Sequence, residues 1–344
     1  MAHSLPSTPR QPSLIDPLGR AITYMRVSVT DRCDLRCLYC MSESMTFLPK
    51  KELLTLEELS RLCRVFVGLG LKKVRITGGE PLVRRGIMAL FRALASMPLQ
   101  ELTLTTNGTQ LGRYAKDLYG CGVRRVNVSL DTLNPVRFRQ LTRGGDVHHV
   151  ISNIDEAAAC GLAIKINVVA LRGINDHESD AMIRWCAERG YDLTFIEVMP
   201  MGEVASSRHE QFVSLDSLYD SVEKHWRLQP AQACVAPALQ GPARRYWLPD
   251  AGIHVGFITP LSHHFCDTCN RVRLTCTGKL YMCLAHEDHA SLRDVLRASP
   301  PDDDTALVHA IQGAIARKPS QHDFVAHMQK SHATLTRHMN VTGG

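Results

Sequence analysis

The amino-acid sequence predicts an α/β fold in which parallel strands form a barrel-like arc, followed by a smaller C-terminal domain. The first supporting observation is that short β-rich segments alternate with helix-compatible segments over residues 21–199, a rhythm typical of βαβ units. The second is that polar residues and glycines directly follow the strands, at the face where barrel enzymes hold their chemistry. The third is composition: 344 residues, 44% hydrophobic and 22% charged, suit a globular chain of about two domains.

The first predicted strand covers residues 21–29, and an amphipathic helix follows at residues 56–70. Further strands are expected at residues 73–77, 101–106, 125–130, 163–170 and 193–199. Helices are expected between them at residues 88–96, 114–121, 147–160 and 180–189. The polar segments at the strand ends are residues 78–81, 105–108 and 129–131, together with Asn167 and Glu197. Because the connections of parallel strands share one hand, these polar groups are expected at one face of the sheet.

The pattern changes near Met201. A helix is expected near residues 215–225, strands at 244–248 and 253–258, a loop at 299–304 and a helix at 306–317. We therefore predict a flexible leader over residues 1–20, a barrel domain over 21–200, a C-terminal domain over 201–330 and a tail over 331–344 that ends in Gly343 and Gly344.

Charge and hydropathy restrict the class of protein. The net charge of +6 is compatible with an anionic ligand but too small for a protein that coats nucleic acid. The longest apolar runs fall short of the roughly 18–20 residues that cross a bilayer, and residues 1–17 lack the apolar centre of a secretory signal. We predict a cytoplasmic protein with neither a nucleic-acid nor a membrane partner.

The chain has 12 cysteines, and three of them share one loop with the spacing Cys33-x3-Cys37-x2-Cys40. In a reducing compartment, clustered thiols hold metals or do redox chemistry more often than they form disulfides. Three thiolates leave one iron of a four-iron cluster open for another ligand. A structural zinc site needs a fourth ligand, for which only the distant His3 is a candidate. The spacing favours an iron–sulfur cluster over zinc.

Cys266, Cys269 and Cys283 form a second triad. Here the spacing leaves zinc and iron–sulfur equally open, because a nearby histidine could complete a zinc site. The candidate histidines are His263, His264 and His286. The remaining cysteines are interpreted as small apolar side chains without a chemical role: Cys63, Cys121, Cys160, Cys186, Cys234 and Cys276.

Basic residues recur on the predicted strands and beside the second triad. They are Arg26, Lys73, Arg75, Lys165, Arg271 and Arg273. If they face one cleft, their mutual repulsion requires a highly anionic ligand, since two unit charges 4 Å apart interact by about 4 kcal/mol at an effective dielectric constant of 20. A nucleoside triphosphate is such a ligand.

Two further features accompany the first triad: Tyr39 just before its third cysteine, and the Gly78-Gly79-Glu80-Pro81 segment after the next strand. By itself this segment is a strand-to-helix turn with proline at a helix start. Together with the cysteine spacing it resembles the radical S-adenosylmethionine (SAM) superfamily. The resemblance implies that SAM chelates the open iron, that one electron cleaves it to a 5′-deoxyadenosyl radical, and that the glycines let the backbone approach the cofactor closely.

Over its length the chain resembles the GTP 3′,8-cyclase family of molybdenum cofactor biosynthesis. The matching segments are residues 26–33, 75–81, 104–108, 127–131, 165–168 and 266–273, with the terminal Gly343-Gly344. The resemblance implies an incomplete (βα)6 TIM-type radical SAM barrel, and a smaller C-terminal domain that carries a second 4Fe-4S cluster. It also implies that the adenosyl radical removes the hydrogen on ribose C3′ of GTP and that C3′ then bonds to C8 of guanine, which gives (8S)-3′,8-cyclo-7,8-dihydroguanosine 5′-triphosphate.

Site residues carry over from this family position by position. Cys33, Cys37 and Cys40 would hold the cluster that cleaves SAM, and Cys266, Cys269 and Cys283 one whose open iron meets guanine. The SAM site would be lined by Tyr39, Gly79, Ser129 and Met199. The GTP site would be lined by Arg26, Arg75, Thr105, Lys165, Arg271, Val272 and Arg273. The groups expected to assist cyclisation are Arg271, Arg273, Gly343 and Gly344.

The same resemblance implies a one-electron donor such as flavodoxin or ferredoxin, a downstream cyclic pyranopterin monophosphate synthase and a homodimer. Two residues depart from the family pattern: Thr194 stands where an arginine is expected, and Thr342 where an apolar residue is expected. Since Thr194 replaces an arginine, the phosphate contact of that position is either missing or supplied by another residue. Two rival hypotheses are a peptide-modifying radical enzyme and a zinc-stabilised binding module without catalysis.

Overall fold

Six parallel strands form the centre of the fold. A computed structural model describes residues 14–202, 208–231, 239, 241–324, 335 and 337–343. The central strands, adjacent in chain order, are β1 (Tyr24–Ser28), β2 (Lys73–Thr77), β3 (Glu101–Thr106), β4 (Arg125–Ser129), β5 (Ala163–Ala170) and β6 (Asp192–Glu197). This confirms the predicted parallel α/β architecture.

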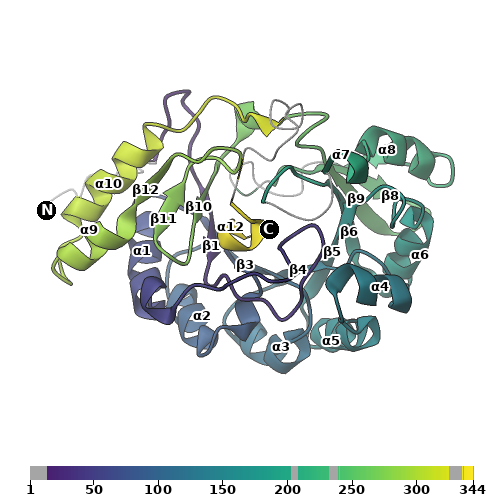
Figure 1. Cartoon of the computed structure of the whole chain (residues 1–344), viewed down its shortest axis with the longest axis horizontal. Helices are drawn as coiled ribbons and strands as arrows, with labels where there is room; N and C mark the ends of the chain where they lie inside the picture. The colour runs from purple at the N-terminus through teal and green to yellow at the C-terminus, as the bar shows by residue number, and fades with distance from the viewer. Residues whose placement is uncertain are drawn as a thin grey trace, which may run out of the picture.

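Helices cover the outer face of this arc, as Figure 1 shows. They are α1 (Leu56–Gly68), α2 (Ile87–Ala95), α3 (Leu111–Gly120), α4 (Pro135–Thr142), α5 (Val147–Ala159) and α6 (Ser179–Arg189). Helix α1 begins with a capping box in which the Thr55 side chain accepts from the Glu58 backbone and the Glu58 carboxylate accepts from the Thr55 backbone. Its apolar stripe, with Leu62 and Phe66 fully buried, packs into the core against the sheet.

The C-terminal segment extends the same sheet at both ends. Strand β9 (Ile253–Ile258) pairs parallel with β6, and β8 (Arg244–Leu248) and β7 (Gln229–Pro230) continue from it antiparallel. At the other end β10 (Arg271–Leu274) pairs parallel with β1, followed by β11 (Lys279–Tyr281) and β12 (His289–Ser291). Within the described residues, all twelve strands belong to this one sheet. The strands of the predicted C-terminal domain thus join the barrel sheet instead of forming their own.

Several C-terminal helices complete the chain. They are α7 (Arg208–Gln211), α8 (Leu215–Glu223), α9 (Leu292–Ala298), α10 (Thr305–Ile315) and α12 (Met339–Thr342), with short 3-10 turns η1 (Lys50–Glu52), η2 (Pro81–Val83) and η4 (Cys266–Thr268). In Figure 1, α12 and the C-terminus lie in the middle of the arc, inside the row of strands. The last described residues therefore lie on the inner side of the sheet.

The predicted leader is too long. Residues 1–13 lie outside the described part, but residues 14–20 are packed. Leu14 is fully buried, Ile15 forms a β-bridge with Ala21, and a buried ion pair joins Arg20 to Asp16. This segment is part of the folded body. In the described part of the chain, the helices are too short or too polar for any of them to traverse a membrane.

Candidate active site

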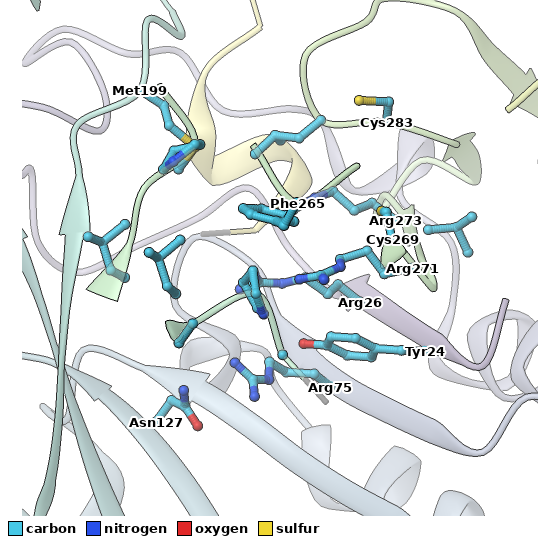
Figure 2. Close-up of a pocket in the computed structure, with 18 of the residues that line it drawn as sticks. Tyr24, Arg26, Arg75, Asn127, Met199, Phe265, Cys269, Arg271, Arg273 and Cys283 are labelled. Atoms are coloured by element: carbon cyan, nitrogen blue, oxygen red, sulfur yellow. The ribbon is translucent and has the colours of Figure 1, made fainter. Parts of the chain in front are cut away.

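A cavity of about 390 Å³ opens between β1, β2, β4 and β5 on one side and the C-terminal segment on the other. Figure 2 shows Arg26, Arg75 and Arg271 around this space, with Cys269 and Cys283 toward one side and Asn127 toward the opposite side. The predicted GTP-site residues that line it are Arg26, Arg75, Lys165, Arg271, Val272 and Arg273. Thr105 does not line the cavity, although it is the register partner of the lining residue Asn127.

Strand register explains how the arginines meet. Arg26 on β1 is the direct partner of Arg75 on β2 and of Arg273 on β10. Partners on neighbouring strands lie about 4.8 Å apart and point to the same face. Three guanidinium groups from distant parts of the chain therefore form one row across the sheet, which we call the arginine row.

Two arginines of the row, and Arg271 beside it, have a donor without an acceptor in the described part of the chain. The Nε atoms of Arg26, Arg75 and Arg271 are buried without a hydrogen-bond partner among the described residues. Burial, together with the charges of Arg75 and Arg271, lowers the pKa of Arg26 to about 10. Buried donors without acceptors are costly in a protein interior. The arrangement thus fits an anionic ligand that accepts these bonds.

Tyr24 was not selected from the sequence, yet its ring lies at the centre of the basic lining. Lys73 Nζ is 5.0 Å from the ring centroid, and the guanidinium carbons of Arg75 and Arg271 are 5.7 and 5.9 Å from it. Burial alone would raise the pKa of Tyr24, but the surrounding cations outweigh it and lower the pKa to about 8. Tyrosines are common in strands, and only the register of β1, β2 and β10 reveals this position.

The first cysteine triad lies on the loop after β1, against the turn after β2. Gly79 N donates to Thr30 O at 2.8 Å, and Glu80 N donates to Arg32 O at 2.8 Å. A Cβ atom on Gly79 would overlap the backbone carbonyl oxygens of Arg32 and Asp31. The close approach that the structure shows for Gly79 is therefore to the cysteine loop itself. Its contact with SAM stays a prediction.

Glu80 anchors this arrangement. Its carboxylate is fully buried and accepts from Leu82 N, Thr106 Oγ1 and Asn107 N at 2.7–2.9 Å. Burial raises the pKa of Glu80 to about 7, against the opposing effect of these hydrogen bonds. Asn107 in turn donates to Cys33 Sγ at 3.6 Å. Glu80 and Asn107 thus connect the ends of β2 and β3 to the cysteine loop.

Tyr39 and Ser129 lie near the same loop, at the end of the strands. Tyr39 donates its hydroxyl to Asp131 Oδ2 at 2.7 Å, and Asp131 Oδ1 accepts from Val169 N at 2.8 Å. Burial raises the pKa of Asp131 to about 6. Ser129 ends β4, two residues before Asp131. Asp131 therefore fixes Tyr39, although the sequence marked it only as a polar residue past a strand. Met199, the fourth predicted SAM residue, lines the cavity instead.

The three thiols of the first triad match the donor set of an iron–sulfur cluster. Burial raises the pKa values of Cys33 and Cys37, and their neighbouring cysteines raise them further. A metal centre offsets this effect because it binds the thiolate form. Within the described residues, no three His, Cys, Asp or Glu side chains are close enough to share one metal ion. In a four-iron cluster each cysteine binds its own iron atom, so the thiols need not converge on a single point.

The second triad lines the cavity directly, with Cys266 on η4, Cys269 after it and Cys283 after β11. Lys318 joins its segments: Nζ donates to Cys269 Sγ at 3.5 Å, to Arg271 O at 3.0 Å and to Met282 O at 2.6 Å. Burial alone would raise the pKa of Cys269, but the charges of Lys318 and Arg271 lower it below its usual value. The lysine thus favours the thiolate that a metal centre requires.

Arg20 supports the same segment from the N-terminal side. It donates to Cys266 O at 2.7 Å, to Ser320 O at 2.9 Å and to Pro319 O at 2.7 Å. A buried arginine therefore connects the chain next to Lys318 with the first cysteine of the triad. Neither cation was selected from the sequence, since the distance along the chain hides both contacts.

Two of the histidines proposed as a fourth zinc ligand have other partners. His263 is hydrogen-bonded to Asp216 and His286 to Gln321 O, while the His264 ring packs edge-on against His322. His322, which the sequence did not suggest, lines the cavity, and its ring nitrogens are buried without a hydrogen-bond partner among the described residues. Burial lowers its pKa. It is a neutral donor and acceptor beside the second triad.

The C-terminal tail enters the site. Arg273 Nη1 donates to Gly343 O at 2.5 Å, and Asn340 Nδ2 donates to Asp31 O at 2.8 Å. Gly343 has a left-handed φ of 74°, and a Cβ there would overlap the Thr77 side chain. The structure thus brings Gly343 to the predicted arginine. Gly344 lies outside the described residues.

The two departures from the family pattern are both buried. Thr194 on β6 is fully buried and does not line the cavity. Thr342 is also fully buried, and its Oγ1, like that of Thr194, has no hydrogen-bond partner among the described residues. Neither hydroxyl is available to a ligand in the cavity.

Comparisons with known proteins agree with this geometry. The family described as "Radical SAM superfamily" matches residues 27–186, and "Molybdenum Cofactor Synthesis C" matches residues 191–324. The chain is 53% identical to a curated protein of Bradyrhizobium diazoefficiens, with 96% of each chain covered. It is 55% identical to one of Paracoccus denitrificans, again with 96% of each covered. Both relatives are named GTP 3′,8-cyclase.

A solved structure resembles the fold at low sequence identity. SuiB of Streptococcus suis with bound S-adenosylmethionine matches with a TM-score of 0.59 and 15% identity, over 93% of this chain and 77% of SuiB. At this identity the match concerns the fold alone.

Proposed function

Because the chain belongs to the GTP 3′,8-cyclase family of radical SAM enzymes, which acts in molybdenum cofactor biosynthesis, we propose that its cavity holds GTP between two cysteine triads, each the site of a 4Fe-4S cluster. The observation that carries this proposal is the arginine row. Arg26, Arg75 and Arg273 face one cavity, the buried Nε atoms of Arg26 and Arg75 have no hydrogen-bond partner among the described residues, and the second triad lines the same cavity.

The arginine row and Lys165 would bind the triphosphate. A planar guanidinium pairs with two phosphate oxygens at once, and such charge-assisted bonds are stronger than neutral ones. Cys266, Cys269 and Cys283 would hold the second cluster, whose open iron meets guanine. The base would then lie beside the second triad, and the phosphates would extend from there along the arginine row toward β4 and β5.

Cys33, Cys37 and Cys40 would hold the first cluster, with SAM near Tyr39, Gly79 and Ser129. Bound there, the cluster and SAM supply the one-electron cleavage that generates the adenosyl radical. The chain's own residues hold ribose, base and adenosyl group in line and keep water out, which is where an enzyme of this type gains its rate. The hydrogen at ribose C3′ would pass to the adenosyl radical to give 5′-deoxyadenosine, and C3′ would bond to C8 of guanine. One further electron, from the one-electron donor, and one proton would complete the cyclised product.

Arg273 and the tail would complete the site. The hydrogen bond from Arg273 to Gly343 holds the last described residue against the arginine row. With Arg271, these groups would orient the nucleotide for ring closure, and Gly344 would extend the same tail. Burial, followed by the charge of Arg26, lowers the pKa of Arg273, so an incoming phosphate stabilises its charged form.

The remaining partners follow from the family and stay proposals. They are a one-electron donor such as flavodoxin or ferredoxin, a downstream cyclic pyranopterin monophosphate synthase, a second copy of the chain in a homodimer and a cytoplasmic location. The zinc-stabilised binding module is ruled out as a description of this enzyme, because the relatives and the matched superfamily are catalytic.

The test is an anaerobic assay of the reconstituted enzyme with a reductant, SAM and GTP. We expect 5′-deoxyadenosine and a cyclised nucleotide by mass spectrometry, and about eight irons per chain, as two four-iron clusters require. A preparation with about four irons that still cyclises GTP would overturn the second cluster. Conversion of a peptide in place of GTP would overturn the substrate.

A further inference from the structure

We propose that Arg245 binds the terminal phosphates of the nucleotide, as part of a second basic group on the β5 and β8 side of the cavity. This inference rests on the proposed function, because it takes the ligand of that cavity to be a nucleoside triphosphate. Nothing in the family resemblance or in the comparisons assigns a role to Arg245. Its location in the sheet, its ion pair and the charges that face it carry the proposal.

Strand register directs Arg245 to the cavity. It is the partner of Gly256 on β9, Gly256 is the partner of Thr194 on β6, and Thr194 is the partner of Asn167 on β5. The four positions share one face of the sheet. Asn167 and Arg245, at the two ends of this row, both line the cavity.

The two middle positions between Asn167 and Arg245 carry only a small side chain, at Thr194, and no side chain, at Gly256. Thr194 is fully buried, and Gly256 has no side chain. A Cβ at Gly256 would lie 3.0 Å from Thr194 Oγ1 and 3.2 Å from Ala243 Cβ, closer than side chains normally pack. A side chain at position 256 would therefore displace Thr194 or Ala243, and Gly256 presents none beside Arg245.

One carboxylate restrains Arg245. Its Nη2 atom is 3.4 Å from Asp192 Oδ2, and Asp192 also accepts from His254 N at 3.1 Å. Asp192 is the register partner of Lys165, so it lies between the two cations. At 28% exposure, the Arg245 side chain is accessible but oriented. Asp192 therefore orients Arg245, but its one negative charge does not neutralise both Arg245 and Lys165.

The positive charge on this side exceeds the negative. Among the described residues that line the cavity here, Arg125, Lys165 and Arg245 are cations. Arg125 pairs with Glu101, which also accepts from Lys73. Burial, and then the charges of Arg125, Arg75 and Arg245, lower the pKa of Lys165 to about 7. A polyanion relieves this repulsion.

The terminal phosphates are the part of the ligand that reaches this group. Strand order places β10, with the second cysteine triad beside it, toward one end of the sheet and β8 toward the other. A nucleotide whose base contacts Cys269 and Cys283 extends its phosphates across β1 and β2 toward β5 and β8. Arg245 therefore contributes to affinity for a triphosphate and little to affinity for a monophosphate.

Arg244 is the matched control. It is adjacent in sequence, its side chain is more exposed than that of Arg245, and it pairs with Asp216 at 3.2 Å. Successive residues of a strand point to opposite faces, and Arg244 does not line the cavity. Both substitutions remove one cation from the same strand. They differ in that Arg245 is on the face toward the cavity and Arg244 is on the opposite face.

The experiment measures binding of GTP, GMP and inorganic tripolyphosphate to the cluster-loaded protein without SAM, by calorimetry, for the unsubstituted enzyme, Arg245→Gln and Arg244→Gln. We expect Arg245→Gln to lower the affinity for GTP and for tripolyphosphate about 10- to 100-fold, which is the usual effect of losing one charge-assisted contact. The affinity for GMP should fall less than about twofold. Arg244→Gln should leave all three affinities unchanged, and both variants should keep the iron content and melting temperature of the unsubstituted enzyme.

Equal weakening of GMP and GTP would overturn the inference, because it would indicate a structural effect. So would a GTP affinity of Arg245→Gln within twofold of the unsubstituted enzyme. The two proposals fail separately: an enzyme that does not cyclise GTP but loses tripolyphosphate binding in Arg245→Gln contradicts the proposed function and supports the role of Arg245. Binding of neither GTP nor tripolyphosphate by the unsubstituted enzyme contradicts both.

Discussion

Arg273 donates to the carbonyl oxygen of Gly343, so the last described residue of the chain is held by a buried guanidinium of the arginine row. This bond connects strand β10 to the tail, and through Arg26 on β1 to the centre of the sheet. The tail and the arginine row are therefore one structural unit.

Substitution of Arg273 should disable cyclisation while both clusters assemble. In Arg273→Ala the tail loses its hydrogen bond and the triphosphate loses a charge-assisted contact, each worth about 1.5–3 kcal/mol. We expect the rate of GTP cyclisation to fall by at least about 100-fold with iron content unchanged. Product and 5′-deoxyadenosine are measured by mass spectrometry, and an undiminished rate would show that Arg273 has no such role.

Lys318→Met should release the second cluster alone. The substitution removes hydrogen bonds to Cys269 Sγ, Arg271 O and Met282 O and a positive charge next to a thiolate. We expect iron to fall from about eight to about four per chain, with the four-iron signal of the first triad kept in electron paramagnetic resonance.

Arg317→Met is the control for Lys318. Arg317 is the adjacent cation, but it is half exposed and faces Asp288 at 3.5 Å. It should retain about eight irons. If Lys318→Met also retained them, Lys318 would not be needed to hold the second cluster.

Gly79→Ala should disrupt the first triad. The added Cβ overlaps the carbonyl oxygens of Arg32 and Asp31, which are rigid backbone atoms, so the loop with Cys33 must move. We expect loss of SAM cleavage and of about four irons per chain. In Gly68→Ala, at the end of α1, a Cβ meets nothing within 4 Å, so iron content and stability should match the unsubstituted protein. Normal iron and activity in Gly79→Ala would show that the loop tolerates the shift.

GTP affinity should decrease as pH rises above 7. In the free protein burial and neighbouring cations lower the pKa of Lys165 to about 7. Bound phosphate favours the protonated lysine and raises this pKa again, so binding takes up a proton in the range above pH 7. At pH 6 the lysine is already charged and the effect is absent.

Calorimetry at pH 6.5 and 8.5, in buffers of different ionisation enthalpy, measures both the affinity and the proton uptake. Lys165→Met should bind GTP more weakly at pH 6.5 and lose the proton uptake that Lys165 causes. If the variant took up as many protons as the unsubstituted enzyme, another group would be responsible.

Strong local patterns made several elements predictable from sequence. Strands β2, β3, β5, β8 and β9 have the predicted bounds, because β-branched and aromatic residues are dense between turn residues. Helix α4 was missed, since half of its eight residues are polar and only three are buried. Strands β10 to β12 were missed because segments of three or four residues carry no clear alternation.

The site residues also fall into two groups, those that the sequence indicated and those that it did not. Motifs marked Arg26, Arg75 and the cysteine triads, since these residue types belong to the family pattern itself. Tyr24, Lys318 and Arg245 could not be found, because their roles depend on contacts with partners far away in the chain, as Arg271 is from Tyr24. Strand order and register, which bring such residues together, follow from tertiary packing instead of local propensity.

The pairing of β1 with β10 also governs when the arginine row can form. During synthesis the first strand emerges from the ribosome more than two hundred residues before its parallel neighbour exists, and until then one edge of β1 remains open to foreign strands. Contacts of such sequence separation form slowly. The nascent protein can close its N-terminal cysteine loop early, but the arginine row is complete only after β10 has been made.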